Sequence, residues 1–118
     1  MLAPAIAAHT DLVRHHVAIS ITGPLATADH GSALLTACLP LPPTYGLLVD
    51  LSAVTSLTET GLNSLRELVR SATTSGHRIA FVCTELILRA ELILADLDTL
   101  APVMHAPEQA MPLVGYAA

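Results

Sequence analysis

Residues 47–65 constrain the fold of this chain more than any other segment. An apolar run at 46–51 carries Asp50 near its end, and a polar stretch rich in hydroxyl side chains follows it. From 59 to 75, apolar residues then recur at the three- and four-residue spacing of an amphipathic helix. We therefore expect a buried strand, a short polar loop and a helix, which is a unit of a parallel α/β sheet.

The rest of the sequence repeats this alternation. Strand patterns at 15–22, 46–51, 78–84 and 103–105 alternate with helical patterns at 28–39, 59–75, 84–97 and 108–114. The Gly-Pro pair at 23–24 is expected to end the first strand, and residues 5–8 can add an edge strand within an ill-defined segment, 1–14. This order predicts a single α/β domain over 1–118, with a mixed, mostly parallel sheet of four or five strands and about four helices.

Composition excludes several classes of partner. The chain has 118 residues and is 53% hydrophobic and 13% charged, so it can bury the core of one domain. Its net charge is −5, it contains no lysine, and only 3% of its residues are aromatic. These features exclude the basic patch and the stacking platforms of nucleic-acid binding, and they disfavour an anionic membrane surface. No apolar run is long enough to span a bilayer, so we expect a cytoplasmic protein without membrane contact.

Motifs that carry enzymatic chemistry are absent from the sequence. The six histidines and two cysteines lack metal-ligand spacing, and no nucleophile elbow or phosphate-binding loop occurs. We expect no metal, no cofactor and no enzymatic activity. Cys38 and Cys83 are interpreted as small buried hydrophobic residues, with a redox pair as the alternative. Asp50 is interpreted as capping the turn that follows it, with a catalytic carboxylate as the alternative.

The turn that opens the helix at 59–75 is the strongest candidate site. Thr58 is a plausible N-cap, Glu59 occupies the first turn, and Gly61 follows closely. A carboxylate gains about 0.3–1 kcal/mol from the dipole at a helix N-terminus, which is reason enough for Glu59 to be there. The functional interpretation is a protein-docking surface whose affinity depends on charge.

Five short motifs occur in a fixed order along the chain. They are ISITGPL at 19–25, LVDLSAV at 48–54, TGLNSL at 60–65, GHRIAFV at 76–82 and PEQA at 107–110. With this order and spacing, the chain from about 15 to 114 resembles the STAS domain of sulphate transporters and anti-sigma factor antagonists. The resemblance implies a STAS-like fold and a free-standing anti-sigma factor antagonist. Such a protein binds an anti-sigma factor, often a serine kinase, and so releases a sigma factor for transcription.

The chain departs from this family at the helix start. The family pattern is Asp-Ser-(Ser/Thr)-Gly with the first Ser as phosphoacceptor, whereas this chain has Thr58, Glu59, Thr60 and Gly61. Glu59 therefore takes the acceptor position with one permanent charge, where a phosphoserine would carry about −1.5 to −2. Two outcomes remain open: constitutive binding of the partner, or weak binding as in the phosphorylated state. We favour constitutive or differently regulated binding.

These considerations define the predicted partner-binding residues. They are Asp50, Thr58, Glu59, Thr60, Gly61, Asn63 and Arg66. An alternative function is a small-ligand or nucleotide sensor that uses the same loop. The pattern at 84–97 is apolar around most of the helix circumference, so we also expect it to make a second contact, such as a homodimer interface.

Overall fold

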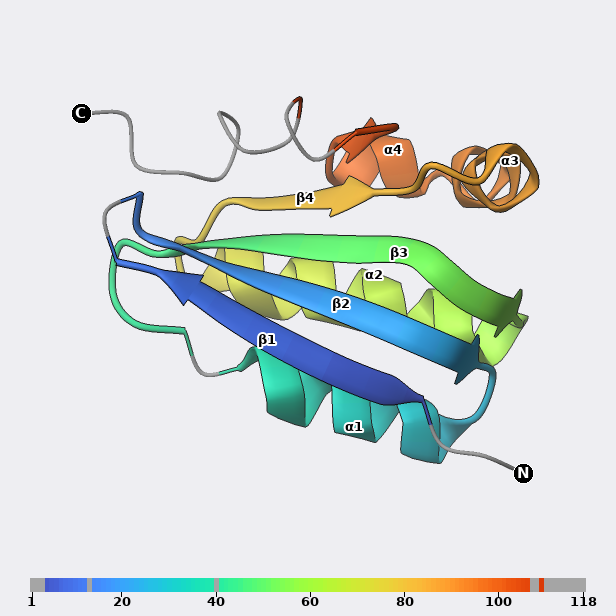
Figure 1. The fold of residues 1–118 in the computed structure, drawn as a ribbon, viewed down its shortest axis with the longest axis horizontal. Coiled ribbons are helices and arrows are strands. Elements are labelled where there is room, and N and C mark those ends of the chain that lie inside the picture. The colour runs from blue at the N-terminus through green and yellow to red at the C-terminus, as the bar shows by residue number, and fades with distance from the viewer. Residues whose placement is uncertain (1–3, 13, 40, 107–108, 110–118) are drawn as a thin grey trace.

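The computed structural model describes residues 4–12, 14–39, 41–106 and 109. Its elements are β1 (Ala5–Asp11), β2 (His16–Leu25), α1 (Ala28–Cys38), β3 (Gly46–Leu57), α2 (Glu59–Thr74), β4 (Ile79–Val82), α3 (Leu86–Leu94), α4 (Leu97–Leu100) and β5 (Val103–Met104). The strands form one sheet in the order β1-β2-β3-β4-β5, in which β1 runs antiparallel to β2 and all other pairs are parallel (Figure 1). The predicted mixed, mostly parallel α/β fold is confirmed.

The core lies between one face of the sheet and helices α1 and α2, which lie side by side behind it in Figure 1. Alternate residues of β2 point into this core, and Ile19 and Ile21 are fully buried there. Phe81 of β4 is the one fully buried aromatic ring in the described part of the chain, so the core is aliphatic as the composition predicts. A smaller apolar cluster, formed by Leu48, Ala80 and Val82, lies on the opposite face.

Two strands are longer than the sequence predicts. β2 continues through Gly23 and Pro24 to Leu25, and β3 continues past 51 to Leu57. The two extensions pair with each other, with irregularities in register between Ser20 and Thr22 and between Gly23 and Pro24. A bulge accommodates a proline and a glycine with positive φ, and Gly23 has φ of 109°. The predicted stop at 23–24 is therefore wrong, because the bulges keep the strands paired.

β1 is also longer than expected, since it runs to Asp11 whereas the sequence indicates an edge strand only at 5–8. The predicted helix at 84–97 is divided: α3 ends at Leu94, Asp96 adopts φ of 60°, and the short α4 follows. A residue in the left-handed region cannot continue an α-helix, which explains the break. The predicted helix at 108–114 lies outside the described residues, apart from position 109. Among the described helices, none is both long and apolar enough to cross a membrane.

Candidate functional site

Thr58 fixes the start of α2 in the predicted way. Its Oγ1 accepts a hydrogen bond from the backbone N–H of Gly61 at 3.3 Å, which makes it the N-cap. The same hydroxyl donates to the carbonyl oxygen of Ala26 at 2.7 Å, in the connection between β2 and α1. The one hydroxyl therefore both caps α2 and ties the turn to a neighbouring loop.

Gly61 allows the first turn of α2 to lie directly against the end of β2. A Cβ atom at this position would overlap the backbone carbonyl oxygen of Leu25. The backbone N–H of Thr58 also points at that carbonyl oxygen, at 3.4 Å. The glycine is required here by close backbone approach, a role that its motif position alone does not reveal.

Glu59 is the first residue of α2, and 74% of its side chain is exposed. Its Oε1 lies 3.3 Å from Nη1 of Arg66, two helical turns further on. Nη1 of Arg66 also donates to Oδ1 of Asn63 at 2.6 Å, and Nη2 donates to the carbonyl oxygen of Ala95 at 3.1 Å. Arg66 thus links two other predicted site residues, Glu59 and Asn63, to the C-terminal end of α3.

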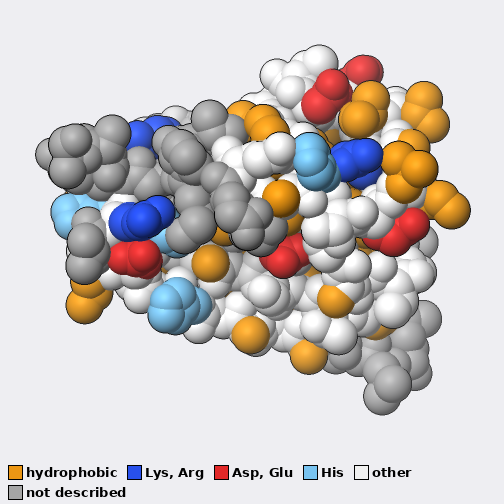
Figure 2. All heavy atoms as spheres, turned by 45° about the horizontal axis from the view of Figure 1, so that its top comes forward, with side chains coloured by type: hydrophobic (Ala, Val, Ile, Leu, Met, Phe, Trp, Pro, Cys, Tyr) orange, Lys and Arg blue, Asp and Glu red, His pale blue; other side chains and the backbone are white. Residues whose placement is uncertain are grey.

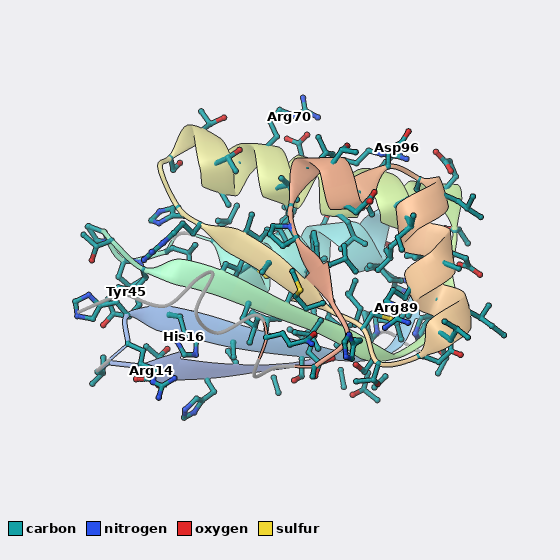
Figure 3. The ribbon with its side chains drawn as sticks, turned by 90° about the horizontal axis from the view of Figure 1, so that it is seen from above. Arg14, His16, Tyr45, Arg70, Arg89 and Asp96 are labelled. Carbon is teal, nitrogen blue, oxygen red and sulfur yellow. The ribbon has the colours of Figure 1, made fainter. Side chains whose placement is uncertain are left out.

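The link from Arg66 to Ala95 is a contact that sequence reasoning missed. The helical periodicity places Arg66 on the solvent side of α2. It cannot show that another helix ends beside that position, 29 residues further along the chain. Arg70, one turn later, points away from the sheet and pairs with Glu67 at 2.7 Å (Figure 3).

Helix α3 presents an apolar surface next to the start of α2. Leu94 is 84% exposed and Ile87 is 69% exposed, and hydrophobic side chains gather at this end of the molecule in Figure 2. A shallow pocket of about 420 Å³ lies between Glu59, Leu62 and Arg66 on one side and Glu91, Leu94 and Ala95 on the other. The surplus of apolar residues at 84–97 is the sequence signal for this surface, and its use as a homodimer contact stays a prediction.

Asp50 is not brought into this arrangement. It precedes the last residue of β3 by seven positions, because the strand continues to Leu57, and it does not line the pocket beside Glu59. Its Oδ1 accepts a hydrogen bond from the backbone N–H of Ser52 at 2.9 Å, but this bond lies within β3, where its register against β2 is irregular, so Asp50 caps no turn as had been predicted. The expectation that Asp50 lies near the end of the strand is wrong, since β3 continues to Leu57.

Both cysteines are buried free thiols. Cys38 lies at the end of α1 and Cys83 follows β4. Burial raises the pKa of the Cys38 thiol from 9.0 to about 12, and burial also raises the pKa of Cys83. The thiolate that redox chemistry needs is therefore disfavoured at both positions. Across the described residues, no group of three His, Cys, Asp or Glu side chains is placed to hold a metal ion.

Comparison with solved structures decides the fold. An anti-sigma factor antagonist from Mycobacterium paratuberculosis aligns with a TM-score of 0.72 and 22% identity over 95% of this chain and 94% of that one. A Thermotoga maritima structure, assigned to the same class provisionally, aligns with a TM-score of 0.75 and 16% identity over 92% and 93%. The chain has the fold of the anti-sigma factor antagonists. Unphosphorylated SpoIIAA, another antagonist, aligns with a TM-score of 0.61 and 12% identity over 89% and 92% of the two chains.

The predicted resemblance is thereby confirmed for the fold. The sequence matches no protein-family model and no curated protein, so the likeness rests on structure. The alignments cover more than nine-tenths of the M. paratuberculosis, T. maritima and SpoIIAA chains. The roles of Asp50, Thr58, Glu59, Thr60, Gly61, Asn63 and Arg66 in partner binding stay predictions.

Proposed function

We propose that this protein is an anti-sigma factor antagonist that binds an anti-sigma factor and thereby regulates transcription that depends on a sigma factor. The contact is formed by the α2 surface, which we define as Thr58, Glu59, Thr60, Gly61, Asn63 and Arg66, together with Leu94 of α3. The antagonist fold of the solved structures supports the general role. The exposed helix start, flanked by an exposed leucine, supports the location.

One observation carries the regulatory part of the proposal: an exposed Glu59 stands at the first residue of α2, where the family resemblance assigns the phosphoacceptor serine. A carboxylate can be neither phosphorylated nor dephosphorylated by a serine kinase and phosphatase. The partner is therefore bound without a phosphorylation switch at this position.

The charge of Glu59 is also balanced within the chain. Arg66 holds its carboxylate at 3.3 Å, so the surface offered to a partner carries an ion pair instead of an isolated anion. A phosphoserine would add a larger charge with three acceptor oxygens at the same point. We infer that the pair resembles the unphosphorylated, binding-competent state more than the phosphorylated one.

The hydroxyls of Thr58 and Thr60, on either side of Glu59, differ in how accessible they are to a kinase. The Thr58 hydroxyl is occupied by Ala26 and Gly61, whereas Thr60 is exposed and has no side-chain hydrogen bond within the described structure. If a kinase modifies this turn, Thr60 is the residue it reaches without breaking the cap. Neither threonine occupies the position that matches the family acceptor.

The proposal is tested by measuring capture of the anti-sigma factors of the organism that carries this chain. Purified protein is immobilised, and the affinity of each captured anti-sigma factor is measured for the wild type, Glu59→Arg and Asn63→Arg. Both changes should weaken binding at least tenfold, because they place excess positive charge and bulk in the contact. Glu67→Gln, a half-exposed change on the same helix, serves as the control and should leave the affinity unchanged. If the two test variants bind as tightly as the wild type, the α2 surface is not the contact.

A second experiment tests the missing switch. Glu59→Ser places a hydroxyl at the matched position, and incubation with a captured anti-sigma kinase and labelled ATP should then phosphorylate that serine. The wild type should take up no label at residue 59 and keep its affinity after the incubation. Loss of wild-type binding after treatment with ATP would show that a switch operates elsewhere in the chain.

A further inference from the structure

Part of β3 has an open edge. β4 is only four residues long and pairs with β3 from Leu47 to Asp50. The later part of β3, from Ala53 to Leu57, pairs with β2 on one side, and no described strand lies on its other side. A strand edge of this kind presents backbone N–H and C=O groups that another extended segment can pair with.

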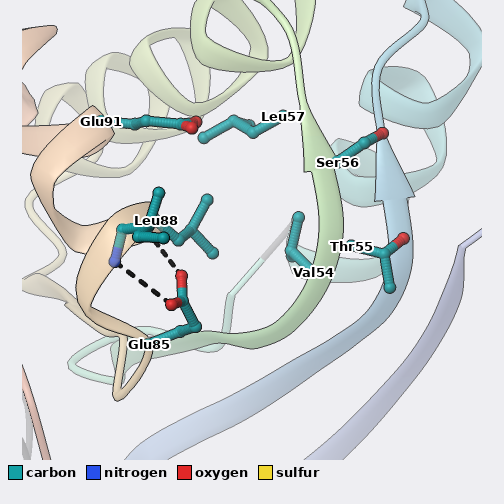
Figure 4. Close-up of a pocket in the computed structure, with 8 residues that line it drawn as sticks. Val54, Thr55, Ser56, Leu57, Glu85, Leu88 and Glu91 are labelled. Atoms are coloured by element: carbon teal, nitrogen blue, oxygen red, sulfur yellow. Dashed lines mark hydrogen bonds between the residues drawn. The ribbon is translucent and has the colours of Figure 1, made fainter.

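Helix α3 faces this open edge across a groove. In Figure 4, the curved end of β3 forms one wall and α3 forms the other, with Val54, Leu57 and Leu88 directed into the space between them. The groove has a volume of about 470 Å³. A strand edge opposite a helix is a geometry that accepts an extended peptide, because the edge supplies backbone pairing while the helix holds side chains.

The chemistry of the groove indicates which side chains would fit. Val54 and Leu57 of the β3 wall are half-buried, and Ile87 of the helix wall is 69% exposed, so both walls offer apolar contact. The charged residues that line the groove are Glu85 and Glu91, and no Arg or His lines it. Glu85 also accepts hydrogen bonds from Ile87 and Leu88 as the N-cap of α3, whereas Glu91 has no ion-pair partner among the described residues.

We propose that an extended segment of the protein partner binds in this groove by adding a strand to the edge Ala53–Leu57. Successive side chains of a strand point to opposite sides, so the segment would alternate apolar residues with Lys or Arg. The apolar set would contact Val54, Leu57 and Ile87, and the basic set would reach Glu85 and Glu91. This inference rests on the proposed function, because it names how the partner is held beside the α2 surface. The groove and that surface are adjacent, since Glu91 lines both the groove and the pocket at Glu59.

Charge argues against a second copy of this chain as the occupant. The chain carries a net charge of −5 and has no lysine, so it offers no segment that alternates apolar and basic residues. Two acidic surfaces would be brought together in such a dimer, at an electrostatic cost. A partner with a basic, extended segment removes that cost and neutralises Glu91.

The first test uses synthetic peptides and the full chain, and needs no anti-sigma factor. An acetylated, amidated VRVKVRV peptide is titrated into isotope-labelled protein, and backbone amide shifts are followed by NMR. We expect saturable shifts at residues 53–57 and 87–91. The acidic analogue VEVEVEV should bind at least tenfold more weakly. A VRVKVRV peptide methylated on alternate backbone nitrogens keeps its side chains but loses its donors, and should show no binding at about 1 mM.

A protein variant tests the contribution of the Glu91 charge to peptide binding without changing the shape of the groove. Glu91→Gln should weaken binding of the basic peptide by about twofold to fivefold, with Glu67→Gln as a half-exposed control that changes nothing. The inference is overturned if the shifts fall outside the groove, if the methylated peptide binds as well as the parent, or if Glu91→Gln has no effect.

If an anti-sigma factor binds the chain and the basic peptide does not compete, this docking mode fails while the proposed function stands. If the peptide binds in the groove and no anti-sigma factor binds, the groove stands and the proposed function fails.

Discussion

Arg66 holds the carboxylate of Glu59 at 3.3 Å and at the same time donates to the carbonyl oxygen of Ala95 at 3.1 Å. The anionic residue at the start of α2 is therefore tied through one guanidinium to the end of α3. A planar guanidinium with five donors can serve several acceptors at once, which a lysine could not do in this geometry. This arrangement gives the helix start a permanent charge that is balanced before any partner arrives.

Replacement of Arg66 should loosen the connection between α2 and α3. We expect Arg66→Gln to lower the free energy of unfolding by about 1 kcal/mol, because it loses a charged hydrogen bond to a part-buried carbonyl as well as an exposed ion pair. Urea unfolding followed by circular dichroism measures the change. Arg70→Gln, which removes an exposed pair with Glu67, should cost less than about 0.5 kcal/mol. Equal losses for the two variants would show that the Ala95 contact contributes nothing.

Gly61 should tolerate no side chain. Gly61→Ala forces a Cβ atom against the backbone carbonyl of Leu25, and we expect a loss of at least about 2 kcal/mol in stability. Gly76→Ala is the matched comparison: it has open space around it and φ of 83°, so it should cost only about 1 kcal/mol through backbone strain. Thermal unfolding of both variants tests the order. A Gly61→Ala protein as stable as Gly76→Ala would contradict the close approach of α2 to β2.

The two threonines of the turn should respond differently to substitution. Thr58→Ala removes the N-cap and the bond to Ala26, so we expect it to destabilise the protein by about 1–2 kcal/mol. Thr60→Ala should change stability by less than about 0.5 kcal/mol, since its side chain is exposed. Urea unfolding midpoints distinguish the two. A larger effect at Thr60 than at Thr58 would mean that the cap is assigned to the wrong residue.

Stability should fall in alkaline solution because of the buried thiols. Burial holds the pKa of Cys38 at about 12, whereas an unfolded thiol loses its proton near 9.0. The unfolded state therefore binds fewer protons than the folded state between these values, and stability declines with rising pH in that window. The slope from Cys38 approaches about 1.4 kcal/mol per pH unit. Urea unfolding at pH 8 and pH 10 should show this decline, and Cys38→Ala should flatten it. An unchanged slope in Cys38→Ala would show that the thiol is not protected by the fold.

The sequence predicts the elements of this fold better than their ends. Apolar periodicity locates α1, α2 and β4 to within a few residues because each is buried along one or both faces. It fails at β3, where Thr55 and Ser56 are polar but belong to a strand that pairs with β2. Polar residues on an exposed strand and in a loop look alike in sequence, and backbone pairing between distant segments decides between them.

In the candidate site, too, local sequence signals predict some features, whereas others depend on contacts between distant segments. Local signals sufficed for Thr58 as the cap and for the exposed position of Glu59, since both depend on a single helix start. The tether from Arg66 to Ala95 and the open edge of β3 depend on how distant segments are placed, and no local pattern encodes them. Asp50 was misplaced for this reason: its bond to Ser52 is local, whereas its separation from Glu59 depends on the length of β3.

The central claim is that the α2 surface binds an anti-sigma factor constitutively, with Glu59 in place of a phosphoacceptor. Isothermal titration calorimetry with a captured anti-sigma factor, before and after incubation with ATP and magnesium, tests it most directly. We expect one dissociation constant under both conditions and at least tenfold weaker binding by Glu59→Arg. Weaker wild-type binding after ATP, or wild-type affinity in Glu59→Arg, would contradict the claim.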